Sequence, residues 1–292
     1  MEALRGIGQV YYQTNDHAKA ETYRKETLAM ARELQKQSPE NEDADILVAN
    51  SLFDMAVVTR DSQAQGYRLE ALPIFEKLLR TKPSDARRQR SAALIHKSIA
   101  GYWLGGDDPD RALPYLQRAL ALDETRLAGD PGNQGAKLDL SFDYSQLGAY
   151  YDTKHDLHTA IEYQRKTLAI RRELAASDPK DVWKQARLAY ALTGTADLLI
   201  EAHDYRAALA NLDESRRISE GLGVSGRDSM EDYARTLEDI GEANRALGNE
   251  QSACEQFAKT RDIYRKLGYS SSGSEASILA AVDKELSTCV QR

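Results

Sequence analysis

Residues 136–179 decide the fold, and they read AKLDLSFDYSQLGAYYDTKHDLHTAIEYQRKTLAIRRELAASDP. Apolar and aromatic residues recur in the first half at three- and four-residue steps, the spacing of one face of an α-helix. The members of this first stripe are Leu140, Tyr144, Leu147 and Tyr151. A second stripe with the same spacing follows, made of Tyr163, Thr167, Ile170 and Leu174. The polar sequence His155-Asp156 separates the stripes, and Pro179 ends the second one. The stretch therefore predicts two α-helices joined by a turn.

Two small residues, Gly148 and Ala160, lie twelve positions apart in these predicted helices. Small side chains let helix axes approach closely, so we expect the two helices to pack at these positions. Together with the aromatic residues and Leu147, this pattern resembles the tetratricopeptide repeat, in which an Ala follows the Leu-Gly pair at the same distance. The resemblance implies a helical hairpin that stacks on further copies of itself. The second helix is longer than in the family, so the period exceeds the usual 34 residues.

The pattern recurs along the chain. The small residue of the first helix falls at positions 100, 148, 196 and 241, so the intervals are 48, 48 and 45 residues. We therefore predict an all-α fold, a right-handed superhelical solenoid of about six helical hairpins with a C-terminal capping helix, forming one domain over residues 1–292. The expected repeats span residues 1–39, 44–83, 87–131, 136–179, 182–222 and 229–268, and the capping helix spans 275–290.

Two parts of the chain depart from the regular pattern. In the second repeat, an apolar helix over residues 46–58 is followed by polar residues 60–67, which we expect to form a long connection. Pro73 is then expected in the first turn of the next helix, where a missing N–H is tolerated. After Gly268, residues 269–273 are rich in Ser and Gly and predict a loop before the capping helix. At the other end, no capping residues precede Leu4, which predicts that sequence is missing upstream.

Composition limits the possible partners. The formal net charge of −7 and the pI near 5.4 argue against nucleic acid or an anionic membrane as the main target. No run approaches the 18 apolar residues of a membrane-spanning helix, and no signal-peptide core follows Met1. Cys254 and Cys289 lie far apart in helical patterns and predict no disulfide framework. We expect a cytoplasmic protein with no membrane insertion.

The sequence predicts no catalytic or metal site. Three histidines, His17, His155 and His203, fall in expected hairpin turns, and His96 takes a packing position in its helix. His155 and His158 have a spacing that could hold a metal, but no further ligand motif follows. The sequence has no glycine-rich phosphate loop, nucleophile elbow or zinc motif. We therefore expect a protein that is not an enzyme and that has no cofactor and no metal.

A binding surface is the remaining feature. In tetratricopeptide arrays the first helices line a concave groove, and the register assigns residues of each repeat to it. The candidate partner-binding residues are Arg5, Gln9, Tyr12, Asn50, Asp54, Leu94, Lys97, Leu104, Phe142, Ser145, Asp152, Tyr190, Thr193, Asp197, Ile200, Arg235 and Glu238. Six of them are apolar or aromatic, more than solubility favours on an open surface: Tyr12, Leu94, Leu104, Phe142, Tyr190 and Ile200. The groove therefore predicts a protein or peptide partner. The carboxylate clamp of some family members is not expected, because Leu94 and Ser98 stand where basic residues are needed.

The long period is similar to the tetratricopeptide arrays that follow the kinase domain in some large bacterial serine/threonine kinases. This resemblance covers nearly the whole chain and implies a non-catalytic arm that docks or senses. Two functions stay open. The first is an interaction scaffold whose groove recruits a partner, as the docking arm of a bacterial signalling protein would. The alternative is a peptide-sensing regulatory domain that controls an attached effector such as a kinase.

Overall fold

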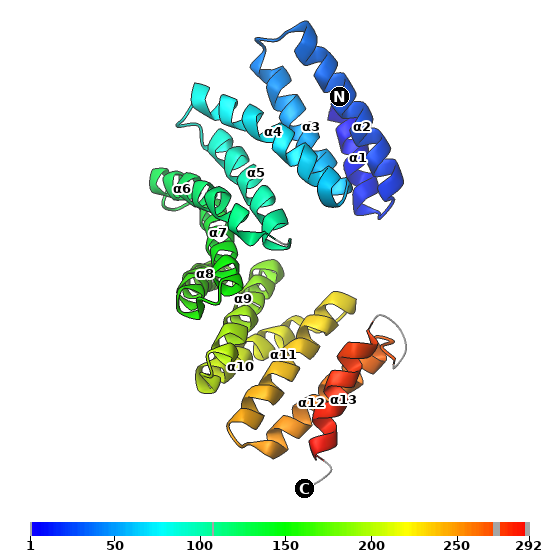
Figure 1. Cartoon of the computed structure of the whole chain (residues 1–292), viewed down its shortest axis with the longest axis vertical. Coiled ribbons are helices and arrows are strands. Elements are labelled where there is room, and N and C mark those ends of the chain that lie inside the picture. The colour runs from blue at the N-terminus through cyan, green and yellow to red at the C-terminus, as the bar shows by residue number, and fades with distance from the viewer. Residues whose placement is uncertain (1, 107, 271–274, 290–292) are drawn as a thin grey trace. The chain divides into compact units, whose positions relative to one another are not determined.

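The computed structural model describes residues 2–106, 108–270 and 275–289, and these contain thirteen α-helices, one short 3₁₀ helix and no strand. The predicted all-α fold is confirmed. Consecutive helices run back and forth as antiparallel hairpins (Figure 1). The expected handedness of the solenoid stays a prediction.

The chain divides into two compact units, Met1–Thr153 and Lys154–Arg292. Unit 1 contains α1 (Glu2–Gln13), α2 (His17–Gln37), α3 (Glu42–Val58), α4 (Asp61–Thr81), α5 (Ala86–Leu104), η1 (Pro109–Ala112), α6 (Leu113–Gly129) and α7 (Gln134–Thr153). Unit 2 contains α8 (Leu157–Ser177), α9 (Val182–Glu201), α10 (Tyr205–Leu222), α11 (Arg227–Ala246), α12 (Glu250–Lys266) and α13 (Ala276–Cys289). Each unit is described by itself below, and the single domain expected over residues 1–292 stays a prediction.

The turns inside the hairpins share one backbone device. The residue before the second helix's N-cap has a positive φ in four of them: Asn15 (61°), His155 (57°), His203 (59°) and Gly248 (81°). The next residue is the N-cap, and in three cases it is an Asp that accepts a hydrogen bond from a backbone N–H of the first turn: Asp16, Asp156 and Asp204. Capping of this kind stabilises a helix by about 1 kcal/mol. His155 and His203 therefore lie in turns, as expected.

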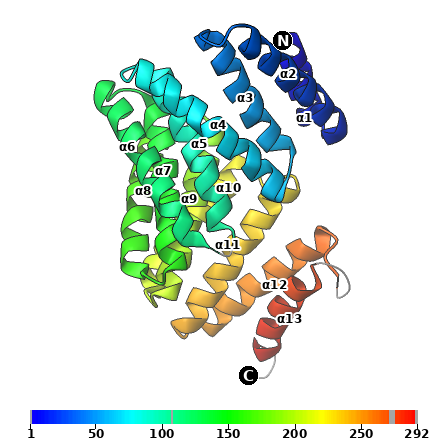
Figure 2. The same cartoon turned by 45° about the horizontal axis from the view of Figure 1, so that its top comes forward.

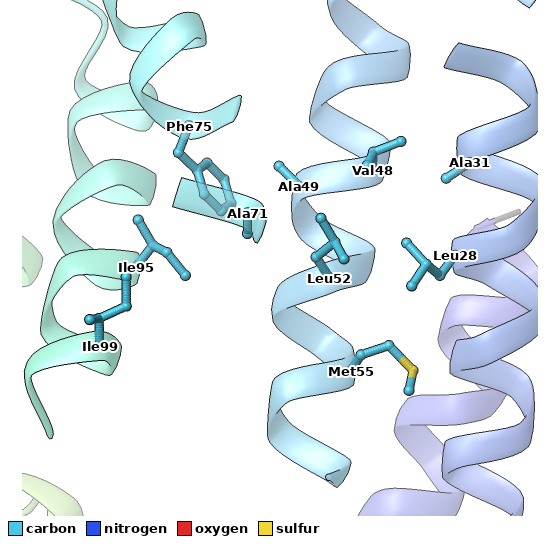
Figure 3. Packing of buried hydrophobic residues seen from close by; sticks show 10 residues of the cluster. All are labelled: Leu28, Ala31, Val48, Ala49, Leu52, Met55, Ala71, Phe75, Ile95 and Ile99. Carbon is cyan, nitrogen blue, oxygen red and sulfur yellow. The ribbon is translucent and has the colours of Figure 1, made fainter. Parts of the chain in front are cut away.

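The core of unit 1 runs between consecutive helices, as Figure 3 shows. Leu28 on α2 faces Val48 and Met55 on α3. On the other side of the cluster, Phe75 on α4 lies opposite Ile95 on α5. Because neighbouring helices bury residues against each other, α2, α3, α4 and α5 share one continuous core.

The cores of unit 2 are built in the same way around α11. One cluster joins α9, α10 and α11 through Leu199, Leu212 and Leu237. A second joins α11, α12 and α13 and contains Phe257. The ring of Phe257 packs directly on Gly241, where an added Cβ would lie only 2.8 Å from a ring carbon. A small residue is thus required at this repeat position, as the period predicts.

The second repeat differs from its prediction. α4 begins at Asp61, so residues 61–67 are helical, and the expected long connection is wrong. These polar residues were predicted as a loop because they lack an apolar stripe, but only Ala64 and Gln65 among them are buried, so a mostly exposed helical face suffices. Pro73 consequently lies inside α4 rather than in its first turn. Its exposed position lets water reach the carbonyl of Leu69, which loses its helical partner.

The C-terminal helix confirms part of its prediction. α13 covers residues 276–289, and Leu279 and Val282 are its buried residues. The predicted loop over 269–273 lies mostly outside the described residues, and so does the last expected helical residue, Val290.

The cysteines overturn the expectation that they do not pair. Cys254 on α12 and Cys289 on α13 form a disulfide, with their Cα atoms 5.9 Å apart. Their separation of 35 residues hid the pairing, because the packing of α13 on α12 brings them together. Arg245 on α11 lies beside the bond, with Nη2 3.3 Å from Cys289 Sγ.

Candidate functional site

A pocket opens in unit 2 where α9, α10 and α11 meet; these helices lie side by side in both views (Figures 1 and 2). We call it the Tyr190 pocket. Its volume is about 190 Å³. Four of its lining residues are among the predicted groove residues: Tyr190, Thr193, Asp197 and Arg235. The lining also includes Ala189, Gly194, Ser215, Ser219, Leu222, Val224, Ser229, Asp232 and Thr236.

α9 supplies one wall of the Tyr190 pocket. Tyr190, Thr193 and Asp197 are three and four residues apart, so they project from one face of the helix. The side chain of Tyr190 is 59% exposed, which is unusual for a large aromatic residue beside a cavity. Its ring is therefore available to a partner.

The inner wall of the pocket carries hydroxyl groups. Thr193 Oγ1 lies 3.0 Å from Ser215 Oγ and 3.3 Å from Thr236 Oγ1. Ser215 and Thr236 also donate to the backbone carbonyls of Ala189 and Asp232. Each hydroxyl thus has a partner, which fixes α9, α10 and α11 to one another and gives the pocket a defined polar wall.

One ion pair crosses the pocket from α11 to α9. Arg235 Nη2 is 2.5 Å from Asp197 Oδ2. Burial nevertheless raises the pKa of Asp197 above its ordinary value. Burial, together with the charge of Asp197, raises the pKa of nearby Asp239 to about 8. Asp239 therefore keeps its proton at neutral pH, whereas Asp197 faces the guanidinium of Arg235.

The size of the pocket limits what it can hold. Sites for drug-sized ligands usually occupy about 300–1,000 Å³, and a cavity of about 150 Å³ accepts one benzene molecule. At about 190 Å³ the Tyr190 pocket matches a single side chain. It fits an anchor residue of a peptide better than a whole cofactor.

The corresponding place in unit 1 is filled by charged side chains. We call the group the Lys97 cluster, and its members are Lys97, Asp123, Arg126, Asp139 and Asp143. Lys97 pairs with Asp123 and lies 3.2 Å from Asp143 Oδ1, and Arg126 Nη1 lies 3.0 Å from Asp139 Oδ2. All five side chains are buried.

The charges of the Lys97 cluster act on one another. Burial raises the pKa of Asp143 to about 8, although Lys97 opposes the shift. Burial would also raise the pKa of Asp139, but hydrogen bonds from Arg90 and Arg126 leave it below its ordinary value. Lys97, expected in the groove, is thus a buried member of an internal network.

The two places are related by the repeat. Measured from the small residue of each helix, the cluster positions of α5, α6 and α7 recur two repeats later on α9, α10 and α11. Lys97, Asp123, Arg126, Asp139 and Asp143 correspond in order to Thr193, Ser219, Leu222, Asp232 and Thr236. All five counterparts line the Tyr190 pocket.

The predicted residues of the first hairpins form a separate group. Arg5 Nε is 2.6 Å from Asp54 Oδ2, and Arg24 Nη2 donates to Gln9 Oε1 at 3.0 Å. The Arg24 guanidinium also lies over the ring of Tyr12, 4.9 Å from its centroid. These contacts bring together four predicted residues of α1 and α3 around a buried arginine that sequence reasoning missed.

The other predicted residues are not gathered at one site. Asn50 lines a different pocket with Arg88 and Ser91, and Glu238 Oε2 accepts from Tyr264 Oη at 3.3 Å. The remaining ones are half-buried on their helices: Leu94, Leu104, Phe142, Ser145, Asp152 and Ile200. The expectation of six exposed apolar side chains is therefore wrong, because Tyr190 is the exposed one of the six and neighbouring helices partly cover the others.

Two of the histidines, His96 and His158, contact glutamate side chains. His96 is buried, as expected, and its Nε2 lies 2.8 Å from Glu76 Oε1. Burial lowers the pKa of His96, although Glu76 opposes the shift. His158 is exposed and lies 3.3 Å from Glu162 on the same helix.

The comparisons agree with this architecture. The family model described as tetratricopeptide repeat matches residues 144–179. BtubC (BKLC) from P. vanneervenii has a similar structure, with a TM-score of 0.60 and 15% identity, covering 88% of this chain and 94% of that chain. The apo form of RapI gives a TM-score of 0.62 at 14% identity, covering 99% of this chain and 70% of that chain. PilW, a type IV pilus biogenesis factor, gives 0.51 at 17%, covering 99% and 97%. No curated protein sequence matches the chain.

The helical hairpins and their repeated small residues define an all-α helical-repeat protein. Within that class, residues 144–179 match the tetratricopeptide repeat and the fold is tetratricopeptide-like, as the sequence predicted. Over residues 2–106, 108–270 and 275–289, no helix is long and apolar enough to cross a bilayer.

Proposed function

We propose that this chain is a non-catalytic scaffold that binds an extended segment of a partner protein on α9 and α11 of unit 2. The observation that carries the proposal is the Tyr190 pocket, which combines an exposed aromatic ring with a cavity of about 190 Å³. The pocket receives one side chain of the partner, and Tyr190 packs against the neighbouring residues of the bound segment.

The chemistry of the lining supports a peptide. Aromatic residues tend to carry the binding energy of protein interfaces. The hydroxyl groups of Thr193 and Ser215 can exchange hydrogen bonds with a peptide backbone. Asp197 and Asp232 line the pocket with Arg235, and two carboxyl groups beside one guanidinium favour a segment with a basic residue over an acidic one.

The resemblance to kinase-linked arrays supports a finer proposal, in which the scaffold is the docking arm of a bacterial signalling protein. The cytoplasmic location stays a prediction. The disulfide between Cys254 and Cys289 argues against a cytoplasmic location, because such bonds persist mainly in oxidising compartments.

Binding by Tyr190 can be tested directly. A displayed peptide library selected on the full chain gives a ligand, and titration calorimetry measures its affinity. Tyr190→Ala should weaken binding by about 1–3 kcal/mol, whereas Trp183→Ala should leave it unchanged. Trp183 is the matched control, because it is an exposed aromatic residue of α9 that does not line the pocket.

Phe142→Ala is a second variant for the same titration. Phe142 has the same register position on α7 of unit 1, and an equal loss there would mean that the ligand also contacts unit 1. Full affinity of the Tyr190→Ala variant, with an unchanged melting curve, would contradict the proposal.

A further inference from the structure

Arg68, on α4 of unit 1, has an unusual environment for a charged side chain. Its guanidinium is half-buried, and both hydrogen-bond partners are neutral. Nε donates to Ser98 Oγ at 2.8 Å, and Nη1 donates to Gln65 Oε1 at 3.4 Å. Burial lowers the pKa of Arg68, and the group that opposes this shift is the hydroxyl of Tyr102, not a carboxylate.

Two other cations of unit 1 with restricted exposure, Arg88 and Arg126, are paired with acids. Arg88 Nη2 lies 2.7 Å from Glu42 Oε2, and Arg126 Nη1 lies 3.0 Å from Asp139 Oδ2. A charge that is withdrawn from water without a counter-charge is costly, so proteins usually pair it or leave it exposed. Within residues 2–106 and 108–153, no carboxylate forms an ion pair with Arg68.

Arg68 lines a cavity of about 690 Å³ between α4, α5 and α7. This volume is in the usual range of ligand sites. Ser98, Tyr102, Trp103 and Gln146 form further parts of the lining. The guanidinium therefore faces open space, and the two aromatic residues offer apolar contact beside it.

We propose that this cavity binds the carboxylate side chain of an acidic residue, Asp or Glu, of a partner protein. The planar guanidinium presents paired N–H donors that match the two oxygens of a carboxylate. Nε is already held by Ser98, which fixes the orientation of the side chain.

Two features favour a monoanion over a phosphate group. Asp61 and Asp108 also line the cavity, and their charges repel a dianion more strongly than a carboxylate. Lys97 lines the cavity too, but it is paired with Asp123 and Asp143, so it adds no free positive charge. Arg68 lies on the second helix of its hairpin, whereas a carboxylate clamp takes its basic residues from first helices. The site also does not depend on the Tyr190 pocket, which lies in unit 2.

A fluorescence titration tests the proposal. The Trp183→Phe form of the full chain keeps Trp103, in the cavity, as its sole tryptophan. The probe is N-acetylglutamate α-amide at constant ionic strength, and its neutral isostere N-acetylglutamine α-amide is the control. We expect a saturable change of Trp103 fluorescence with the glutamate probe and none with the glutamine probe.

Variants assign the effect to the guanidinium. Arg68→Gln should weaken the response at least tenfold, whereas Arg80→Gln, an exposed position of the same helix, should not change it. Without probe, Arg68→Gln should melt at the same temperature as its parent or higher, because it removes a half-buried charge that no carboxylate within residues 2–106 and 108–153 pairs with.

Other results would overturn the proposal. No saturable response to the glutamate probe, equal responses to the two probes, or an unchanged response in Arg68→Gln would each do so. Tighter binding of inorganic phosphate than of the glutamate probe would show that the ligand is a phosphate instead.

Discussion

The Lys97 cluster of unit 1 and the Tyr190 pocket of unit 2 occupy the same positions of the repeat, yet one is filled and the other is open. In unit 1, α6 contributes Asp123, which pairs with Lys97, and Arg126, which pairs with Asp123 and Asp139, and these side chains fill the space between the helices. In unit 2, α10 contributes Ser219 and Leu222 at these positions. Shorter and uncharged side chains leave the cavity that we propose as a binding site.

This difference shows how the same repeat positions can form an ionic core in one unit and an open pocket in the other. A buried ion pair is stable only when every charge has a partner, so the positions of the Lys97 cluster depend on one another. The hydroxyl groups of the Tyr190 pocket tolerate change more readily, because each one loses only a neutral hydrogen bond when it is removed. A binding surface can therefore vary at positions where an ionic core cannot.

The largest expected effect on the free energy of unfolding comes from truncating the side chain at the same repeat position in each unit. Asp123→Ala leaves Lys97 and Arg126 without their shared partner and should lower the free energy of unfolding by about 3–5 kcal/mol. Ser219→Ala, its counterpart, should change stability by no more than about 0.5 kcal/mol. Urea unfolding measures both, with Trp103 reporting on unit 1 and Trp183 on unit 2 in single-tryptophan forms. Equal losses would mean that the two places are not different in kind.

The disulfide gives a smaller effect, confined to unit 2. Reduction of the bond between Cys254 and Cys289 should lower the stability of α12 and α13 by about 2–4 kcal/mol, because it releases a closed loop of the unfolded chain. Unit 1 has no cysteine and serves as an internal control. Cys254→Ser should reproduce the effect without reductant. Two titratable thiols in the untreated, unfolded protein would show that the cysteines are not bonded.

The dependence of the unfolding free energy on pH should be opposite in sign to that of an ordinary acidic ion pair. The folded pKa of Asp143 is raised to about 8, so the folded state keeps a proton that the unfolded state releases near pH 4. The stabilisation is complete below the unfolded pKa and is lost as the pH rises through about 8. The slope is at most about 1.4 kcal/mol per pH unit.

Asp143→Asn tests this dependence unit by unit. It should flatten the pH profile of unit 1, while Asp239, whose pKa is also raised to about 8, should maintain a similar dependence in unit 2. Urea unfolding at several pH values measures both. A profile of unit 1 that keeps its slope in Asp143→Asn would assign the titration to another group.

The sequence predicts the fold well because hairpin geometry is local. The spacing of apolar residues predicts the helices. Sequences such as His203-Asp204 predict the turns, because an Asp N-cap acts within one turn of its helix. The start of α4 was missed because its first two turns have few buried residues, so periodicity gives no signal there. The pairing of Cys254 with Cys289 depends on helix packing over 35 residues, which spacing alone does not reveal.

The register assigns Tyr190, Thr193, Asp197 and Arg235 to one groove, and all four line the Tyr190 pocket. That they bind a partner stays a prediction. The register could not show that Lys97 is buried, because its partner Asp123 comes from α6, a second helix. A comparison of second-helix residues at the repeat period would have given a signal, because charged residues at 123 and 126 become uncharged at 219 and 222.

The central claim is that the open pocket of unit 2 is the binding site, and filling it is the most direct test. Gly194 lies in the pocket wall, and an added Cβ there meets nothing within 4 Å, so Gly194→Leu can fill the cavity without disturbing the helices. Gly221→Leu on α10 is the matched control, since its surroundings are equally open and it does not line the pocket. In titration calorimetry with the selected peptide, Gly194→Leu should weaken binding by about 1–3 kcal/mol while Gly221→Leu binds normally. Full affinity of the Gly194→Leu protein, with its fold intact, would contradict the account.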